Sequence, residues 1–222
     1  MDSLFEFNML KKDYIKFIQN KLFDRYSEPH LFLEVKNPLE SMIATILSAQ
    51  CTDARVNQVV SVLFKKYKSV EDYANADINE FEKDIKSTGF YRNKAKNIIN
   101  SCRIILQKHN GVVPKEMDKL VALPGIGRKT ANIVLSNGYG IVVGIPIDTH
   151  MKRTNFRLGL TKNKDPDKIE QDLIKIIPRD KWFHYAFAGI SLGREFCRAP
   201  TPICSKCFLK GDCKKIGVKN KY

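Results

Sequence analysis

The chain has 222 residues and carries 38 lysines and arginines against 24 aspartates and glutamates, which gives a formal net charge of +14. A charge this basic indicates an anionic partner, and we favour nucleic acid over a membrane because no apolar run is long enough to span a bilayer. Ribosomal proteins and ordinary basic enzymes share such a charge, so it does not by itself identify a function. The length suits one large domain or two small ones with a substantial core.

Cysteine usage and the N-terminal segment indicate the cellular compartment. The segment MDSLFEFNMLKKDYIKF lacks the basic start, apolar stretch and cleavage site of a secretion signal. Of the six cysteines, four lie between Cys197 and Cys213. This clustering favours a reduced cytoplasm and a metal or cluster site over a disulfide framework. We therefore expect a cytoplasmic protein.

Apolar residues recur at helical spacing along most of the chain, which predicts a series of amphipathic helices. Representative members of these stripes are Leu10, Phe17, Leu22, Ile43, Val60, Phe81, Ile98 and Ile169. The tetrapeptide NPLE at 37–40 has the N-cap, first-position proline and capping-box acid of a helix start. No convincing alternating strand is present, although residues 141–147 are β-branched enough to be extended. The predicted fold class is all-α.

A polar junction, LSAQCTD at residues 47–53, separates the first two core helices. Thr52 or Asp53 is placed to cap the second of these helices, which leaves Gln50 on a loop. Spacing alone favours an ordinary helix junction at this point.

A turn rich in proline and glycine, LPGIG at residues 123–127, separates two short predicted helices. Pro124 cannot continue a helix, and Gly125 and Gly127 allow backbone angles that are closed to other residues. The free N–H groups at the start of the second helix, together with the positive end of its dipole, form a ready phosphate site. An ordinary corner between two helices fits the turn equally well.

Two potentially reactive side chains follow this turn. Lys129 lies in the first turn of the predicted helix, where the dipole disfavours an ammonium and so favours the free amine that Schiff-base chemistry needs. Asp148 follows an apolar run, where a carboxylate can stabilise a developing sugar cation or transfer protons. In a chain this charged, single lysines and aspartates are more often solvated surface groups.

The most specific local pattern is the cysteine spacing C-x6-C-x2-C-x5-C, formed by Cys197, Cys204, Cys207 and Cys213. Four thiolates on one compact loop can hold either a zinc ion or a cubane iron–sulfur cluster. The spacing itself does not decide between these two groups.

Three motifs agree on one family. LPGIGRKTANIVL, the later IDTH and the four cysteines resemble the endonuclease III family of DNA glycosylases, from about residue 35 to Cys213. In that family the lysine of GRKTA is the nucleophile and the aspartate of DTH is the second catalytic group. The resemblance therefore implies these roles for Lys129 and Asp148, and a [4Fe-4S] cluster on the four cysteines.

The resemblance also implies DNA contacts. The family's LSAQ-TD junction carries a glutamine that fills the gap left by a flipped nucleotide, which corresponds to Gln50. Its GLYN-like loop supplies a wedge on the opposite strand, and here Phe90 replaces the usual leucine, so a stacking wedge and a core side chain both stay open. The hairpin residues expected to contact DNA are Gly125, Gly127, Arg128 and Thr130.

The two lobes of the family imply the domain organisation. Residues 31–141 are expected to form a six-helix bundle with a helix-hairpin-helix at about 117–136, and residues 1–30 with 142–222 a helical cluster domain. The predicted function is a bifunctional DNA glycosylase and abasic-site lyase of base excision repair. Its expected partner is double-stranded DNA with oxidised pyrimidines or abasic sites, bound by a monomer and without a membrane. A mismatch-type thymine or uracil glycosylase and a non-catalytic DNA-binding hairpin module are the alternatives.

Overall fold

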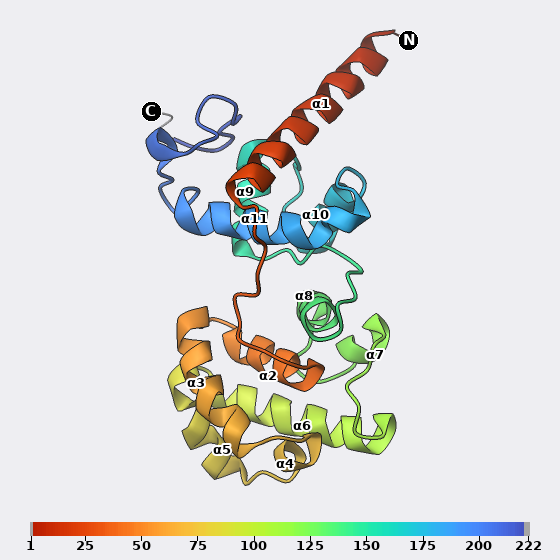
Figure 1. Cartoon of the computed structure of the whole chain (residues 1–222), viewed down its shortest axis with the longest axis vertical. Coiled ribbons are helices and arrows are strands. Elements are labelled where there is room, and N and C mark those ends of the chain that lie inside the picture. The colour runs from red at the N-terminus through yellow and green to blue at the C-terminus, as the bar shows by residue number, and fades with distance from the viewer. Residues whose placement is uncertain (1, 220–222) are drawn as a thin grey trace. The chain divides into compact units, whose positions relative to one another are not determined.

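The computed structural model describes residues 2–219, with side chains from residue 13 onward, and is shown in Figure 1. Eleven α-helices and no β-strand occur within these residues, so the all-α prediction is confirmed. The chain divides into two compact units, one formed by Leu31–Val143 and the other by Met1–His30 with Gly144–Tyr222. We call them the middle unit and the terminal unit. No helix among the described residues is long and apolar enough to cross a lipid bilayer.

The middle unit, all of whose residues are described, contains seven α-helices where the resemblance implied six. They are α2 (Pro38–Ser48), α3 (Asp53–Lys66), α4 (Val70–Ala74), α5 (Ile78–Ile85), α6 (Tyr91–His109), α7 (Met117–Val121) and α8 (Arg128–Ile133). A 3-10 turn, Lys86–Thr88, follows α5, and a π-helical turn, Val134–Gly138, continues α8. Two of the seven, α4 and α7, are only five residues long.

Helix α2 forms the centre of this unit because every residue from Ser41 to Leu47 is buried. It begins as the sequence predicts: the Asn37 side chain accepts a hydrogen bond from the backbone N–H of Glu40 at 2.9 Å, and Pro38 occupies the first turn. The π-helical turn after α8 packs on this start, since a Cβ at Gly138 would lie 2.6 Å from the Cα of Pro38.

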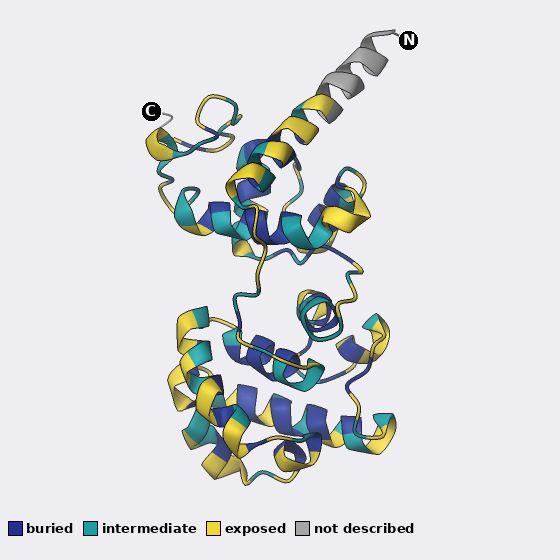
Figure 2. Cartoon of the chain, in the orientation of Figure 1, coloured by how far each residue is buried: buried dark blue, intermediate teal, exposed yellow. Residues whose placement is uncertain are grey.

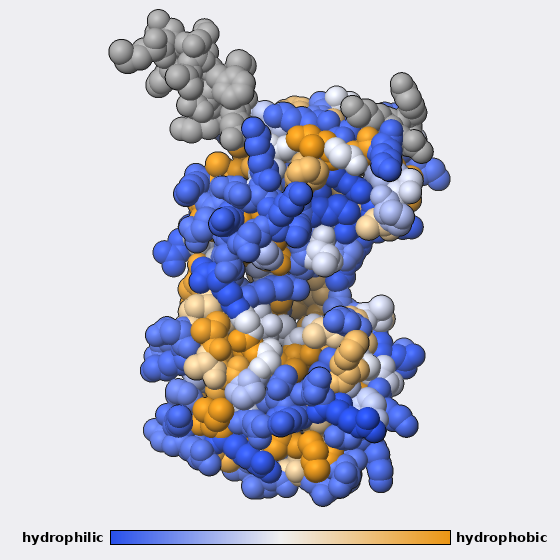
Figure 3. All heavy atoms as spheres, turned by 180° about the vertical axis from the view of Figure 1, so that it is seen from behind, coloured by the Kyte–Doolittle hydropathy of each residue, from blue (hydrophilic) through white to orange (hydrophobic). Residues whose placement is uncertain are grey.

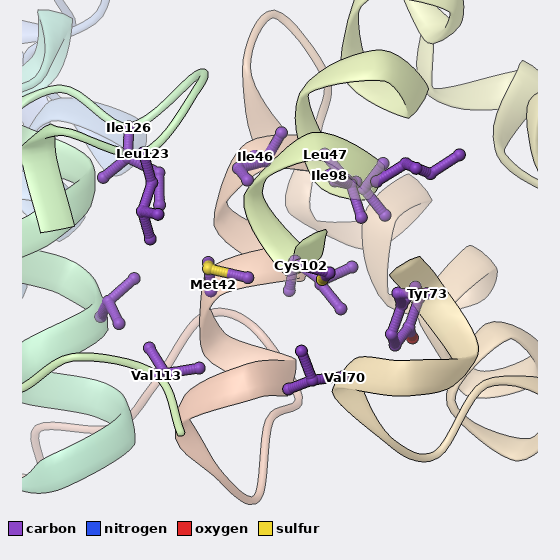
Figure 4. Close-up of a cluster of buried hydrophobic side chains, with 14 of the residues drawn as sticks. Met42, Ile46, Leu47, Val70, Tyr73, Ile98, Cys102, Val113, Leu123 and Ile126 are labelled. Carbon is purple, nitrogen blue, oxygen red and sulfur yellow. The ribbon is translucent and has the colours of Figure 1, made fainter. Parts of the chain in front are cut away.

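The core of the middle unit joins α2 to the hairpin between α7 and α8. Figure 4 shows Leu123 and Ile126 of the hairpin in the same buried cluster as Met42 and Ile46 of α2. All four side chains are at most 4% exposed. Burying side chains of this size contributes about 1.5–3 kcal/mol each, so apolar packing fixes the hairpin on the central helix.

The terminal unit contains α1 (Asp2–Arg25), α9 (Thr149–Leu158), α10 (Pro166–Ile174) and α11 (Trp182–Glu195) among the described residues. Its core includes Ile18, Leu22, Met151, Leu173, Tyr185 and Leu192. After α11 the chain forms an irregular segment whose regular structure is limited to short 3-10 turns such as Cys204–Lys206. Figure 2 shows that buried residues line the inner faces of the helices, and Figure 3 shows hydrophilic residues over most of the opposite view.

The prediction that Phe17 belongs to the buried face of the first helix is wrong. Phe17 is 44% exposed, whereas Ile15, Ile18 and Leu22 are buried. These three residues follow the i, i+3, i+7 spacing of one helix face, and Phe17 lies about 100° away from Ile18 around the axis. The side chain of Leu10, expected in the same stripe, lies outside the described residues.

Candidate functional site

The turn between α7 and α8 depends on one glycine conformation. Gly125 has φ +77°, a left-handed angle that other residues rarely adopt. A Cβ at this position would also lie only 2.7 Å from Nδ2 of Asn97 on α6. On the same helix the Ser101 hydroxyl donates to the carbonyl of Pro124 at 3.0 Å. Helix α6 therefore fixes the turn through the packing of Asn97 against Gly125 and the hydrogen bond from Ser101.

Gly127 differs from Gly125, contrary to the expectation that both glycines use special backbone angles. Its φ of −89° and ψ of 175° are extended values that any residue adopts. An added Cβ would meet no heavy atom within 4 Å, so the space in front of this residue is open. Neither the backbone conformation nor packing within the protein requires a glycine at position 127.

Gly127 is also the N-cap of α8, and it has no side chain to bond the first N–H groups of that helix. The bond from the N–H of Ala131 to the carbonyl of Gly127, at 2.9 Å, closes the first turn. Arg128 and Lys129 are exposed at this end, and Thr130 is half-buried. Helix start, open space and an exposed amine thus occur together, an arrangement suited to an anionic ligand.

Asp148, in the terminal unit, is the N-cap of α9. Its Oδ1 accepts a hydrogen bond from the backbone N–H of Met151 at 2.7 Å. This bond fixes the orientation of the half-buried carboxylate and uses only one of its two oxygens, Oδ1. The side chain therefore has a structural role as a helix cap in addition to any chemical role.

Gln50 and Phe90 have the same unusual backbone conformation, with φ of 54° and 48° respectively. Both residues are exposed, and 63% of Phe90 is accessible to solvent. Phe90 is therefore not part of the core, although it is a large apolar residue. Left-handed angles at residues other than glycine are rare and often mark functional positions.

The four cysteines line a single cavity, together with apolar side chains and Arg157. None of them is in a disulfide. Within residues 13–219 no three cysteine, histidine or acidic side chains converge closely enough to hold a single metal ion. Burial raises the pKa of the Cys207 thiol to about 11, and burial also raises the pKa of Cys213.

Two arginines of α9 hold the first cysteine of this loop. Arg157 Nη1 donates to Sγ of Cys197 at 3.5 Å and to the carbonyl of Arg198 at 2.8 Å. Arg153 Nε donates to the carbonyl of Cys197 at 2.7 Å, and its Nη2 donates to the carbonyl of Gly193 on α11 at 3.0 Å. The helix that begins at Asp148 thus also supports the cysteine loop.

Sequence reasoning missed three residues that shape these sites: Lys94, Arg153 and Arg157. The two arginines are four residues apart on one helix, and that spacing was the available signal that they share a face. Lys94 follows a GFYRN segment and precedes an apolar stripe, and nothing in its neighbours indicates that it is buried. Lysine is almost never fully buried without partners, so the pattern favours a surface position.

Comparison with known proteins places these features in one family. Residues 43–179 match the HhH-GPD superfamily of base excision DNA repair proteins. Endonuclease III of Synechocystis sp. is 48% identical over 181 residues, covering 82% of this chain and 83% of the relative. Endonuclease III of Bacillus subtilis is 42% identical over 214 residues, covering 96% and 97%.

A solved structure described as a trapped endonuclease III–DNA covalent intermediate superposes with a TM-score of 0.88 at 41% identity. The superposition covers 92% of this chain and 96% of the solved one. Sequence and fold agree over nearly the whole length. The chain therefore belongs to the endonuclease III family of the HhH-GPD superfamily.

Proposed function

We propose that this protein is a bifunctional DNA glycosylase and abasic-site lyase of base excision repair in which Lys129 is the nucleophile. The family supports the reaction class. The observation that carries the residue assignment is the exposed amine of Lys129 at the first turn of α8, beside the unobstructed Gly127. A solved relative is described as covalently trapped on DNA, in accord with a nucleophile of this kind.

The proposed reaction proceeds in two stages. The free amine of Lys129 forms a bond to C1′ of the sugar while the bond from C1′ to the base breaks, and the base leaves with that electron pair and gains a proton. Asp148 stabilises the positive charge that develops on the sugar and assists proton transfer. The attached nitrogen loses its extra proton, and the C1′–O4′ bond then breaks as O4′ gains a proton, which opens the sugar ring and leaves an imine. The imine loses a proton from C2′, and the C3′–O bond breaks so that the 3′ phosphate leaves with its electron pair. Water then hydrolyses the imine and releases Lys129.

The hairpin grips the DNA backbone beside the lesion in this proposal. The N–H groups at the start of α8 donate to a phosphate that approaches across Gly127, where no side chain blocks the way. Arg128 and Thr130 lie in the same turn and add charge and a hydroxyl. Gly125 contributes indirectly, because its left-handed conformation shapes the turn.

Gln50 and Phe90 act on the base pair that is opened. Extruding a nucleotide costs a few kcal/mol of stacking and pairing, and side chains that enter the duplex offset part of this cost. Both residues are exposed on tight turns, which suits insertion. Gln50 fills the gap left by the extruded nucleotide, and the exposed ring of Phe90 stacks against bases as the wedge.

The four cysteines hold a [4Fe-4S] cluster in this proposal. All four cysteines line one cavity, which supports a group held by the four thiolates together, and the family supports an iron–sulfur cluster as that group. The cluster would supply rigid cross-linking of the loop, and the basic residues around it, including Arg198 and Lys206, would contact phosphates. The relatives from Synechocystis and Bacillus subtilis are bacterial proteins, which supports action in the cytoplasm.

Borohydride trapping on abasic DNA tests the nucleophile. We expect the wild-type protein to form a covalent adduct and Lys129→Ala to lose at least about 1000-fold in adduct formation. The matched control is Lys119→Ala, which removes an exposed lysine of the same hairpin that is paired with Glu116 at 3.1 Å. Trapping by Lys129→Ala at the wild-type level would refute the assignment.

A panel of duplexes, each with one lesion, separates the remaining alternatives when base release and strand cleavage are scored independently. Oxidised pyrimidines are the expected substrates, with release and cleavage together. Release of thymine or uracil from mismatches without cleavage would identify a monofunctional mismatch enzyme. Salt-sensitive binding with neither reaction would identify a DNA-binding module without catalysis.

A further inference from the structure

Lys94, on the first turns of α6, is a lysine buried inside the middle unit. Only 4% of it is exposed. Its Nζ donates to the carbonyl of Leu47 at 2.7 Å and to the carbonyl of Thr88 at 2.8 Å. Burial lowers the pKa of Lys94, which reflects the cost of keeping an ammonium away from water. Because burying an ammonium is unfavourable, the two hydrogen bonds that Lys94 makes indicate a structural role.

Both carbonyls lie at the ends of helical segments that lead into the two DNA-inserting turns. Leu47 is in the last turn of α2, three residues before Gln50. Thr88 ends the 3-10 turn, two residues before Phe90. The final carbonyls of a helix lack partners within it and carry its negative end, so a lysine between two such ends satisfies both.

The two turns need this support because each contains a residue in a strained conformation. Gln50 has φ 54° and Phe90 has φ 48°. Left-handed angles at residues other than glycine persist only where the surroundings determine them. Both side chains are exposed, so their own packing does not provide that support. The carbonyls bonded to Lys94 lie three residues before Gln50 and two residues before Phe90, so Lys94 anchors the chain close to both positions.

The polar row that begins at Lys94 continues along α6 to the hairpin. Asn97 packs against Gly125, and Ser101 donates to the carbonyl of Pro124 at 3.0 Å. Residues 94, 97 and 101 are spaced i, i+3, i+7 and therefore share one helix face. A single face of α6 thus contacts the Gln50 turn, the Phe90 turn and the hairpin turn.

We propose that Lys94 is a positioning residue that clamps the Gln50 and Phe90 turns together, so that both side chains enter the duplex in a fixed arrangement relative to the hairpin. The proposal rests on the roles proposed above for Gln50 and Phe90. It predicts that Lys94 contributes to opening of the base pair and contributes little to the chemistry of Lys129.

Single-turnover rates on two substrates test this proposal. One duplex carries a base-paired lesion, which must be extruded, and the other carries a preformed abasic site, which has no base to extrude. We expect Lys94→Met to slow base excision by at least tenfold more than it slows cleavage at the abasic site. Fluorescence of 2-aminopurine placed beside the lesion should also show less unstacking with this variant.

The matched control is Arg103→Met on the same helix. Arg103 Nε donates to the carbonyl of Ala74 at the end of α4, and so makes the same kind of bond at a place unconnected with the three turns. Its substitution should change both rates by the same small factor. If Lys94→Met does not fold, Lys94→Gln keeps N–H donors on a shorter side chain and is measured in its place.

The outcomes distinguish the positioning role of Lys94 from the proposed roles of Gln50 and Phe90 on which it rests. Equal losses of excision and abasic-site cleavage in the Lys94 variant, with normal 2-aminopurine fluorescence, would overturn the clamp. Wild-type excision by both Gln50→Ala and Phe90→Ala would instead refute the proposed roles of those two side chains. A selective loss in all three variants would support both proposals.

Discussion

The two units hold their functional segments by different physical means. In the middle unit the hairpin is anchored by apolar side chains, with Leu123 and Ile126 packed in the core around α2. In the terminal unit the cysteine segment also packs apolar side chains on the core, among them Phe208, Leu209 and Val218, but it depends on polar bonds as well. Helix α9 adds hydrogen bonds to this segment, above all from Arg157.

This difference predicts a difference in robustness. Apolar packing involves many small contacts, so the hairpin keeps its shape whether or not a ligand is bound. A segment held by a few hydrogen bonds and by a bound group depends on each of them. We therefore expect the hairpin to be preformed and the cysteine loop to depend on the proposed cluster and on the arginines of α9.

Among the variants that test this comparison, the largest expected effect concerns Asp148, which is both a helix cap and a proposed catalytic group. Asp148→Asn keeps an oxygen that accepts from the N–H of Met151 but removes the negative charge. Base excision should fall by about 100-fold or more, because the charge that stabilises the sugar cation is lost. The unfolding temperature should stay nearly unchanged. Single-turnover kinetics and thermal unfolding are the two measurements.

Asp165→Asn is the control for this variant. Asp165 is the N-cap of α10 in the same unit and accepts from the N–H of Lys168 at 3.0 Å. It should leave both excision and stability close to wild type. An equal loss of excision in the two variants would show that capping of helices in this unit, and not the charge of Asp148, controls the rate.

The next effect separates the two glycines of the hairpin. Gly125→Ala should destabilise the protein by roughly 2 kcal/mol, because the left-handed angle and the contact with Asn97 both oppose a Cβ. Gly127→Ala should leave stability within about 0.5 kcal/mol and weaken DNA binding by about tenfold, because the methyl group occupies the path of the phosphate. Denaturant unfolding and binding titrations at one salt concentration measure the two effects.

Unchanged DNA affinity in Gly127→Ala would contradict the proposed approach of the phosphate. A loss of stability in the same variant would contradict the open space seen in front of Gly127. Each glycine therefore serves as the control for the other, since both lie in one turn.

Arg157→Met tests the dependence of the cysteine loop on α9. The substitution removes the bonds of Arg157 to Cys197 Sγ and to three backbone carbonyls. A net contribution of about 1.5 kcal/mol from these bonds corresponds to roughly tenfold faster loss of iron to a chelator from the proposed cluster. The visible absorbance of the cluster follows the loss with time. Arg198→Met is the control, since the Arg198 side chain is exposed in the same loop and donates to the carbonyl of Arg194 on α11, not to the cysteines. Equal rates in the two variants would mean that α9 does not secure the cluster.

Much of the middle unit could be predicted from the sequence because its signals are local. The NPLE segment marks the start of α2, and Asn110, with φ 51°, ends α6 beside Gly111. The hairpin glycines located the candidate site, but not the different roles of Gly125 and Gly127. Those roles depend on Asn97, which lies 28 positions away from Gly125 and on another helix.

Several features that escaped prediction have at most a weak local pattern in the sequence. Helix α11 contains the nearly continuous apolar run WFHYAFAGI, in which no face stands out because both sides pack against neighbours. The burial of Lys94 depends on two carbonyls that are distant in sequence. Arg153 and Arg157 looked like surface charges because the loop they bind begins forty residues later. Contacts between residues that are distant in sequence leave no local pattern in one amino-acid sequence.

Helix α4 was also missed, although it carries a signal, and it gives the smallest expected effect. Ser69 and Asp72 form a reciprocal capping box: the Ser69 hydroxyl accepts from the N–H of Asp72 at 3.1 Å, and Asp72 Oδ2 accepts from the N–H of Ser69 at 3.0 Å. Ser69→Ala should lower the free energy of unfolding by about 1 kcal/mol. Ser61→Ala, at an exposed serine inside α3, should have almost no effect.

The size of the stability loss in Ser69→Ala tests whether apolar packing, more than single hydrogen bonds, holds the elements of the middle unit. Val70 and Tyr73 bury α4 against the core, and Arg103 bonds to the carbonyl of Ala74 at its end. If packing holds the elements of the middle unit, removal of one cap leaves α4 in place and the loss stays near 1 kcal/mol. A loss of 3 kcal/mol or more in denaturant unfolding would show that this helix depends on a few hydrogen bonds, as the cysteine loop does.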